Sequence, residues 1–224
     1  MNGASHERGY QPIVTSYDYG ALLTETGDYT EKYRLFRREL TGRDDLEGLP
    51  PEQPKIRYGR IPFTDGADLL ACRDLLADPV HDAAPLPMEL LGQGYWFTLY
   101  HTHVEGPREE KTLWIDRSHD RALIFVNGQF RAVQYRNDIQ STLALSVPRE
   151  GLDLDILVEN MCRVNYGEHI DDVKGVTRGV RLGNAWLFHW DMWPLTLENL
   201  SVVPFRKNIP AFHGRSLLLR AEPA

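Results

Sequence analysis

The segment Leu152–Val176, with the sequence LDLDILVENMCRVNYGEHIDDVKGV, decides the fold class of this chain of 224 residues. From position 152 to position 158 every even position is aliphatic, while Asp153 and Asp155 occupy odd positions. This period of two is typical of a half-buried β-strand. We therefore expect the even positions, among them Leu154 and Ile156, to face a core, and the two aspartates to face solvent.

The loop that follows this strand is rich in hydrogen-bonding side chains, and Gly167 closes it. We predict that Asn160, Arg163 and Asn165 hold the loop in place through neighbouring backbone groups, because most buried polar side chains pair with the main chain. Tyr166 belongs to the same structural motif. The alternative is a ligand site, since binding residues are often carried on loops.

Strand signals also occur on both sides of this segment. Asn127-Gly128 lies between two of them and predicts a two-residue type I′ hairpin. Eight short strands separated by turn residues predict an antiparallel sandwich or jelly roll. The predicted strands cover residues 95–104, 111–115, 121–126, 129–135, 141–147, 152–159, 176–182 and 185–190.

The composition is that of a mildly acidic globular protein, with a formal charge of −7 and 42% hydrophobic residues. This charge argues against nucleic acid or an anionic membrane as a partner. No apolar run approaches the roughly 18–20 residues that cross a bilayer. Two cysteines, Cys72 and Cys162, imply no disulfide framework. The N-terminus lacks a signal-peptide pattern, so the chain as written is expected in the cytoplasm.

Two segments carry a family resemblance. LVENMCRVNYGEHIDDVKG, at 157–175, resembles the LVENMGRVNYG…I.D.KG segment of the glycoside hydrolase family 35 β-galactosidases. TSYDYGALLTETGDYTEKYRLFR, at 15–37, resembles TSYDYDAPLxEAGxxTEKYxxxR of the same family. The chain departs from the family at Cys162, where the family has Gly, and at Gly20, where it has Asp.

The resemblance implies a chain of four parts. Met1-Asn2-Gly3-Ala4 matches the inner part of a family segment, so we expect Met1 to be internal to a longer protein with a barrel upstream. The expected parts are 1–48, the last βα unit of a (β/α)8 barrel; 49–88, a linker with a possible edge strand at 56–63; 89–207, a jelly-roll sandwich like the galactose-binding domains; and 208–224, the first strand of a further β-domain.

One helix is predicted in the first part. Asp28 and Glu31 form a variant of the capping box, and Gly42 is placed to end the helix. Tyr33, Phe36 and Leu40 share one face with Tyr29. Because the barrel strands that would cover this face are not in the chain, we expect it to be exposed.

The resemblance implies the hydrolysis of terminal β-D-galactosides with retention. Such enzymes use two carboxyl groups about 5 Å apart, but no segment here matches either catalytic glutamate motif. We therefore predict no catalytic residue, cofactor or metal in this chain, and expect it to be inactive alone. Tyr19 matches the galactose-contacting tyrosine of the family, with Tyr17 and Asp18 as supporting loop residues. A galactoside is the expected substrate of the full enzyme, and a separately encoded barrel half is a possible partner.

Two other functions compete with this interpretation. A non-catalytic carbohydrate-binding or structural module is one, since Trp186, Trp190 and Trp193 could form a sugar-stacking platform, although packing is the commoner role of such clusters. His101 and His103 lie on one side of a predicted strand and suggest a metal site of the cupin type, but the spacing of that motif is not kept.

Overall fold

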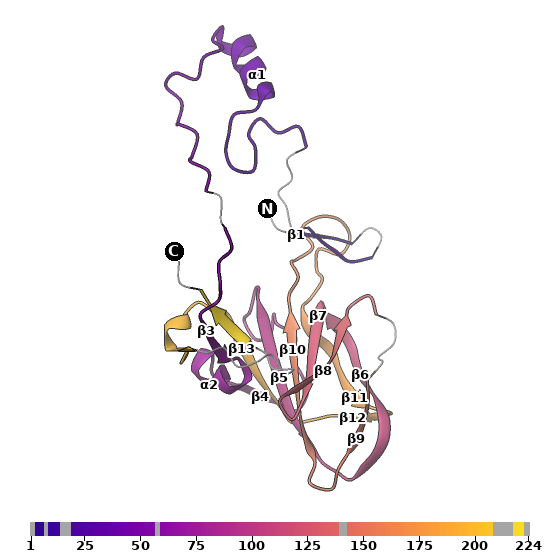
Figure 1. The fold of residues 1–224 in the computed structure, drawn as a ribbon. Helices are drawn as coiled ribbons and strands as arrows, with labels where there is room; N and C mark the ends of the chain where they lie inside the picture. The colour runs from indigo at the N-terminus through magenta and orange to yellow at the C-terminus, as the bar shows by residue number, and fades with distance from the viewer. Residues whose placement is uncertain are drawn as a thin grey trace.

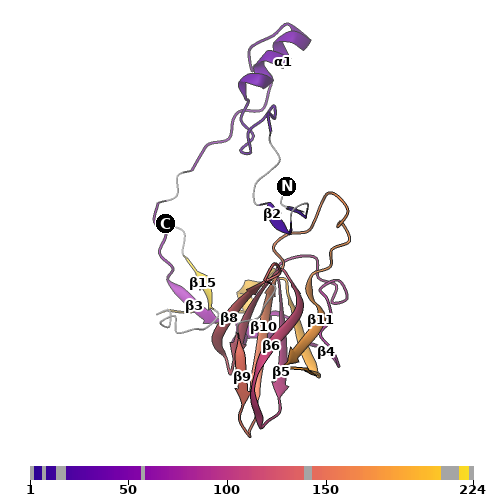
Figure 2. The ribbon, with the colours of Figure 1, turned by 90° about the vertical axis from the view of Figure 1, so that its right-hand side faces the viewer.

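The computed structural model describes residues 3–6, 9–13, 19–56, 59–138, 143–207 and 217–221. Two antiparallel sheets face each other and form a β-sandwich (Figures 1 and 2), which confirms the predicted fold class. The six-stranded sheet has the order β4 (Val80–Asp82), β13 (Trp190–Leu195), β5 (Phe97–Val104), β10 (Leu152–Glu159), β7 (Arg121–Val126), β8 (Gln129–Tyr135). The four-stranded sheet has the order β12 (Ala185–Trp186), β11 (Gly175–Leu182), β6 (Arg108–His119), β9 (Ala144–Val147).

Strand β10 lies inside the six-stranded sheet, between β5 and β7. Its residues Leu154, Ile156 and Val158 are fully buried between the two sheets, as the alternation predicts. The opposite face carries Leu157, which is also buried, in a second cluster that includes residues of the short helices η1 (Leu70–Cys72) and α2 (Arg73–Leu76).

The prediction that Asp155 faces solvent is wrong, whereas Asp153 is exposed as expected. Asp155 is only 4% exposed and accepts hydrogen bonds from Arg73 and from His101. The physical reason is that α2 covers part of the outer sheet face, so both faces of β10 are buried there.

The β7–β8 hairpin agrees with the prediction from its turn residues. Asn127 has φ of 50° and Gly128 has φ of 71°, and positive φ at both central positions is what a type I′ turn requires. Both flanking strands have their predicted bounds. Of the three clustered tryptophans, Trp190 and Trp193 are buried, while Trp186 is 46% exposed.

The N-terminal residues form a small hairpin at one end of the sandwich. β1 (Gly3–Ser5) pairs with β2 (Gln11–Ile13), and Ala4 and Tyr10 are buried against Val164 of the loop after β10. Sequence periodicity gave no sign of this hairpin. The β-prone run Ile13–Tyr17, which the expected βα unit would use as its strand, lies mostly outside the described residues.

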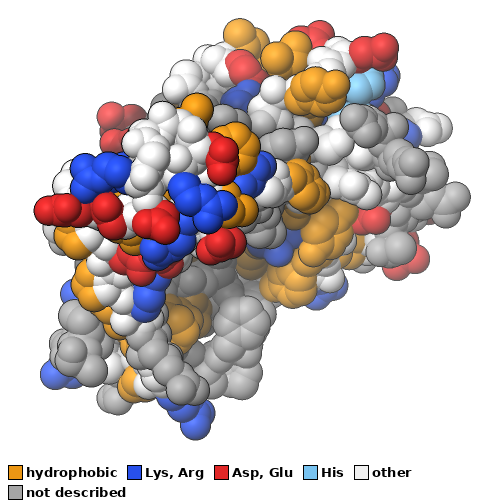
Figure 3. All heavy atoms as spheres, turned by 90° about the horizontal axis from the view of Figure 1, so that it is seen from above, with side chains coloured by type: hydrophobic (Ala, Val, Ile, Leu, Met, Phe, Trp, Pro, Cys, Tyr) orange, Lys and Arg blue, Asp and Glu red, His pale blue; other side chains and the backbone are white. Residues whose placement is uncertain are grey.

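Helix α1 (Glu31–Thr41) projects away from the sandwich (Figure 1) and has no buried residue. Its N-cap is Thr30, whose hydroxyl accepts from the Tyr33 amide at 3.3 Å, so the prediction of a cap at Asp28 is wrong. Asp28 instead forms an ion pair with Lys55. Phe36 and Leu40 are exposed, and Figure 3 shows hydrophobic side chains among acidic and basic ones when the molecule is viewed from above.

A third sheet lies beside the sandwich, with the order β14 (Arg206–Lys207), β3 (Asp65–Asp68), β15 (Leu217–Arg220). The edge strand predicted at 56–63 is wrong for the described residues there, which are exposed and outside any strand. Pro62 has no amide hydrogen to donate to a sheet, and the nearest strand, β3, begins after it at Asp65. Within 208–224, residues Leu217–Arg220 form β15, which pairs with β3. That this segment opens a further β-domain stays a prediction.

Candidate functional site

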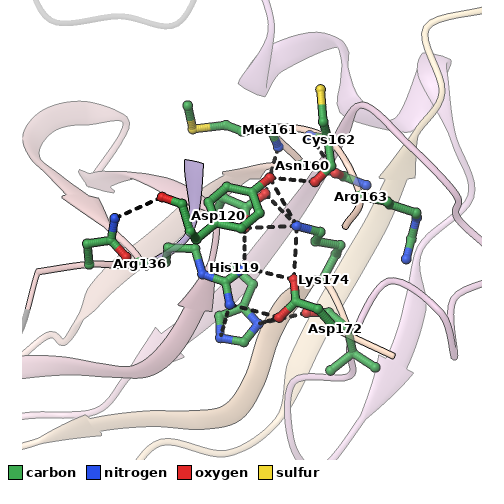
Figure 4. A network of polar contacts seen from close by, with 12 residues as sticks. His119, Asp120, Arg136, Asn160, Met161, Cys162, Arg163, Asp172 and Lys174 are labelled. Carbon is green, nitrogen blue, oxygen red and sulfur yellow. Dashed lines mark hydrogen bonds and ion pairs between the residues drawn. The ribbon is translucent and has the colours of Figure 1, made fainter. Parts of the chain in front are cut away.

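A buried ionic network lies where the N-terminal hairpin meets the sandwich (Figure 4). Its centre is Lys174, whose side chain has no exposed surface. The Lys174 Nζ donates to the two carboxylate oxygens of Asp120 at 3.0 and 2.9 Å, and lies 3.1 Å from an oxygen of Asp172. It also donates to the Tyr10 hydroxyl at 3.2 Å.

A second cation completes the network. Arg136 donates to both oxygens of Asp172, each at 2.8 Å, and to Asp120 at 2.8 Å. The Asp120 side chain is 1% exposed, and those of Arg136 and Asp172 are 8% exposed each. Two cations therefore face two carboxylates, which is the balance that buried charges require.

The network joins four segments that are distant in sequence. Asp120 lies between β6 and β7, Arg136 follows β8, Asp172 and Lys174 end the loop between β10 and β11, and Tyr10 belongs to the N-terminal hairpin. The loop after β10 is attached through its backbone, since the Met161 amide donates to Asp120 at 2.8 Å and the Cys162 carbonyl accepts from the Tyr10 hydroxyl.

Tyr10 brings the N-terminal hairpin into the same network. The guanidinium carbon of Arg136 and the Nζ of Lys174 lie 4.3 and 4.2 Å from the centre of its ring. Cations at this distance from an aromatic ring are attracted to its face. The hairpin is thus held by cation–π contacts as well as by the hydroxyl.

The electrostatics of the network fix its protonation state. Burial would raise the pKa of Asp172, but hydrogen bonds from Arg136 and the charges of Lys174 and Arg136 hold that pKa well below its usual range. Burial and the neighbouring Asp120 raise the pKa of the Tyr10 phenol. Burial lowers the pKa of His119, against an opposing hydrogen bond with the Val173 carbonyl. Asp172 is therefore ionised and Tyr10 neutral over the physiological pH range.

The predicted loop residues lie beside this network. Asn160 donates to the Gly94 carbonyl at 3.0 Å and accepts from the Cys162 amide at 3.1 Å. Arg163 donates to the Gly94 carbonyl at 2.7 Å and to Glu89 at 2.6 Å. Glu89 also accepts from the Lys174 amide, so it links Arg163 to the network.

The other predicted site residues are distributed differently. The side chain of Asn165 lies against Gly3 of β1, where a Cβ on the glycine would come within 2.6 Å of the amide carbon. Tyr166 is 75% exposed. Tyr19 is 86% exposed, and the carbonyl of its neighbour Gly20 accepts from Lys32 of α1 at 2.6 Å. Tyr17 and Asp18 lie outside the described residues.

The histidines of the alternative metal site each pair with an aspartate of β10. His101 bonds to Asp155 at 2.8 Å and His103 to Asp153 at 2.8 Å. Within the described part of the chain, no three His, Cys, Asp or Glu side chains are grouped so that they could hold a metal ion. A helix of the length and hydrophobicity needed to cross a membrane is likewise absent from the residues that the structure describes.

Sequence reasoning missed the ionic network, although Asp172 and Lys174 fall inside the quoted I.D.KG motif. Their burial depends on Asp120, Arg136 and Tyr10, which no local pattern connects to them. The network is closed to solvent and every charge in it is matched, so the chemistry it supports is structural. It fastens the loop after β10 to the N-terminal hairpin.

The fold is that of an antiparallel β-sandwich domain, and the network is a buried set of matched charges at one end of it. Comparison with known proteins assigns it to a family. The family described as "Beta-galactosidase, first all-beta domain" matches residues 85–196. The chain belongs to the glycoside hydrolase family 35 β-galactosidases.

Individual relatives match over most of this chain. The "Beta-galactosidase-1-like protein" of Mus musculus is 33% identical over 231 residues, which cover 95% of this chain and 35% of the relative. The "Beta-galactosidase" of Homo sapiens is 36% identical over 207 residues, or 88% of this chain and 30% of the relative. "Beta-galactosidase 8" of Oryza sativa subsp. japonica is 35% identical over 213 residues, or 88% and 32%. The chain thus spans about a third of the length of these relatives.

Proposed function

We propose that this chain is the non-catalytic part of a retaining β-galactosidase that hydrolyses terminal β-D-galactosides, and that the chain alone is inactive. The observation that carries this proposal is the family match over the sandwich, combined with the electrostatics of the ionic network. A retaining glycosidase needs one carboxyl group with a raised pKa to act as general acid. In Asp172 the pKa is lowered instead, and Asp120 and Asp172 are both buried beside two cations.

The proposed role of the sandwich is to support the catalytic barrel. Residues 1–48 resemble the last βα unit of that barrel, and Tyr10 from this segment is bound by Lys174 and Arg136 of the sandwich. The network would then fix the angle at which the barrel sits on the sandwich. A separately made barrel half is the partner that this role implies, and Tyr19 is its proposed contact with galactose.

Activity assays test the first half of the proposal. We expect the purified chain to show no turnover of a chromogenic β-galactoside, because the chain contains neither catalytic glutamate motif. The matched control is Tyr19→Phe, which should be equally inactive. Turnover that scales with the purity of the chain and survives Tyr19→Phe would contradict the proposal.

Co-expression tests the second half. A barrel half of a related β-galactosidase, produced as a separate polypeptide, should co-purify with the chain and gain activity. Lys174→Met should weaken this pairing because it releases the Tyr10 hairpin. Pairing and activity that are the same with Lys174→Met would show that the network has no part in supporting the barrel.

A further inference from the structure

The outer face of the four-stranded sheet carries a row of aromatic and charged side chains. Arg181 of β11 is paired with Trp114 of β6 on one side and with Trp186 of β12 on the other. Their sequence neighbours Leu113 and Leu182 are buried in the core. Because alternate residues of a strand face opposite ways, the row Trp114–Arg181–Trp186 faces away from the core.

Trp186 is held on this face by a glycine. The six-membered ring of its indole lies against Gly179, where a Cβ would be 2.8 and 3.1 Å from two ring carbons. Only glycine leaves room for the ring in this position. One side of the indole is thus supported by backbone, while the residue as a whole is 46% exposed. The ring is a rigid apolar surface open to solvent.

Arg181 is fixed in the middle of the row. Its guanidinium carbon lies 5.0 Å from the centre of the Trp114 ring. Its Nε donates to Asp116 at 3.2 Å, and its Nη1 donates to the Gly183 carbonyl at 3.0 Å. The Nη2 has no hydrogen-bond partner in the part of the chain that the structure describes. A fixed guanidinium therefore offers donors next to two indole rings.

A groove of about 780 Å³ runs along Trp114 and Arg181. This volume lies within the usual range of small-molecule sites, roughly 300–1,000 Å³. Charges of both signs line it, so no strong field of one sign selects an ion. Its charged and aromatic lining comprises Arg108, Glu109, Glu110, Lys111, Trp114 and Arg181. Trp186 is outside this lining and flanks it through its pairing with Arg181.

The ligand that fits this combination is a neutral saccharide. A sugar ring presents C–H groups on its faces, which stack on indole rings, and hydroxyl groups on its edges, which both donate and accept hydrogen bonds. Arginine and lysine supply donors here, and the glutamates supply acceptors. The two glutamates disfavour a phosphate or another polyanion.

We propose that the groove, with Trp114, Arg181 and Trp186, is a saccharide-binding surface of this sandwich. It is separate from the loop after β10 and from the segment that carries Tyr19. The site would attach the protein to a glycan chain at a place other than the bond that the proposed enzyme cleaves. It goes beyond the proposed function and does not depend on it.

Calorimetric titration of the purified chain tests this proposal. The probes are β-1,4-galactotetraose and cellotetraose, with galactose for comparison. We expect saturable binding of at least one tetrasaccharide, weakened about tenfold or more by Trp186→Ala, as the loss of one stacking contact of roughly 1.4 kcal/mol predicts. Trp114→Ala should weaken binding similarly. The matched control is Trp96→Ala, at an exposed tryptophan directly before β5, which should change affinity less than twofold.

Two results would overturn the proposal. One is the absence of binding by either tetrasaccharide at millimolar concentration, with a melting curve that shows the chain folded. The other is binding that Trp186→Ala and Trp114→Ala leave unchanged. If Trp186→Ala alters folding, Trp186→Leu serves as a second variant, because it keeps an apolar side chain against Gly179 but offers no ring for stacking. Neither result bears on turnover of β-galactosides, so the proposed function stands or falls separately.

Discussion

Lys174→Met is the sharpest test of the buried network. The substitution keeps the length of the side chain but removes its charge. The carboxylates of Asp120 and Asp172 would then face each other with Arg136 as their only cation, in a site where the Lys174 side chain has no exposed surface. An uncompensated buried charge is among the most destabilising changes a domain can undergo.

The expected cost follows from the contacts. The Lys174 Nζ makes three hydrogen bonds, two to Asp120 and one to Tyr10, and an ion pair with Asp172. Breaking a buried pair by removing one partner costs about 3–5 kcal/mol. For a domain of this size each kcal/mol lowers the Tm by about 2–4 °C. We therefore expect the Tm to fall by roughly 6–20 °C.

Thermal and urea unfolding, followed by circular dichroism, measure the effect. Asp171→Asn, at an exposed neighbour of the network, is the matched control and should change the Tm little. The double variant Lys174→Met/Asp120→Asn should recover part of the loss, because it removes the charge that the first substitution leaves unpaired. A Lys174→Met protein as stable as the original chain, or a double variant worse than the sum of the single ones, would refute the reasoning.

Three further predictions concern stability. Arg163→Ala should lower the Tm in a thermal scan, since it removes bonds to Gly94 and Glu89, and should leave galactose affinity unchanged; the reverse result would make the loop a lectin site. Asp155→Asn should cost about 1–3 kcal/mol in urea unfolding, because it weakens buried bonds, while Asp153→Asn on the exposed side should cost little; equal effects would contradict the assigned burial. Unfolding free energy measured from pH 3 to 11 should be highest near pH 7–9. It should fall below about pH 6.5, because His119 then binds a proton in the unfolded chain but, with its lowered pKa, not yet in the fold. It should fall further below about pH 4, where Asp172 is protonated only in the unfolded chain. It should also fall above about pH 10, because the raised pKa of Tyr10 keeps its phenol neutral in the fold; constant stability from pH 7 to 4.5 would argue against the neutral, buried state of His119.

Local patterns were sufficient where local geometry decides the structure. The alternation in β10 placed Leu154, Ile156 and Val158 in the core, and Asn127-Gly128 fixed the β7–β8 turn. These features depend on strand periodicity and on the φ values that turns require. Neither periodicity nor turn geometry predicts which strands pair in a sheet. The spacing of the strands was nevertheless sufficient to predict the fold class.

Features that depend on distant partners could not be predicted in this way. Asp155 follows the same alternation as Asp153 and differs only because α2 and Arg73 cover it. The strand β3 has the sequence DGAD, which has no β-strand pattern, so its place in a sheet is decided by β14 and β15. Lys174 is buried because Asp120, Arg136 and Tyr10 from three other segments surround it together with the nearby Asp172, and no window of sequence around it contains those three.

The pairing of β3 with β15 has a consequence for the order of events during synthesis. Asp68 lies opposite Leu217, so the partner strand leaves the ribosome about 150 residues later. At synthesis rates of about 5–20 residues per second, this delay is roughly 8–30 s. All strands of both sandwich sheets are made within that interval, and domains generally fold as units while translation continues. The sandwich can therefore be complete before the small sheet begins to form, and β3 must remain without its β15 partner on the nascent chain until the last strand arrives.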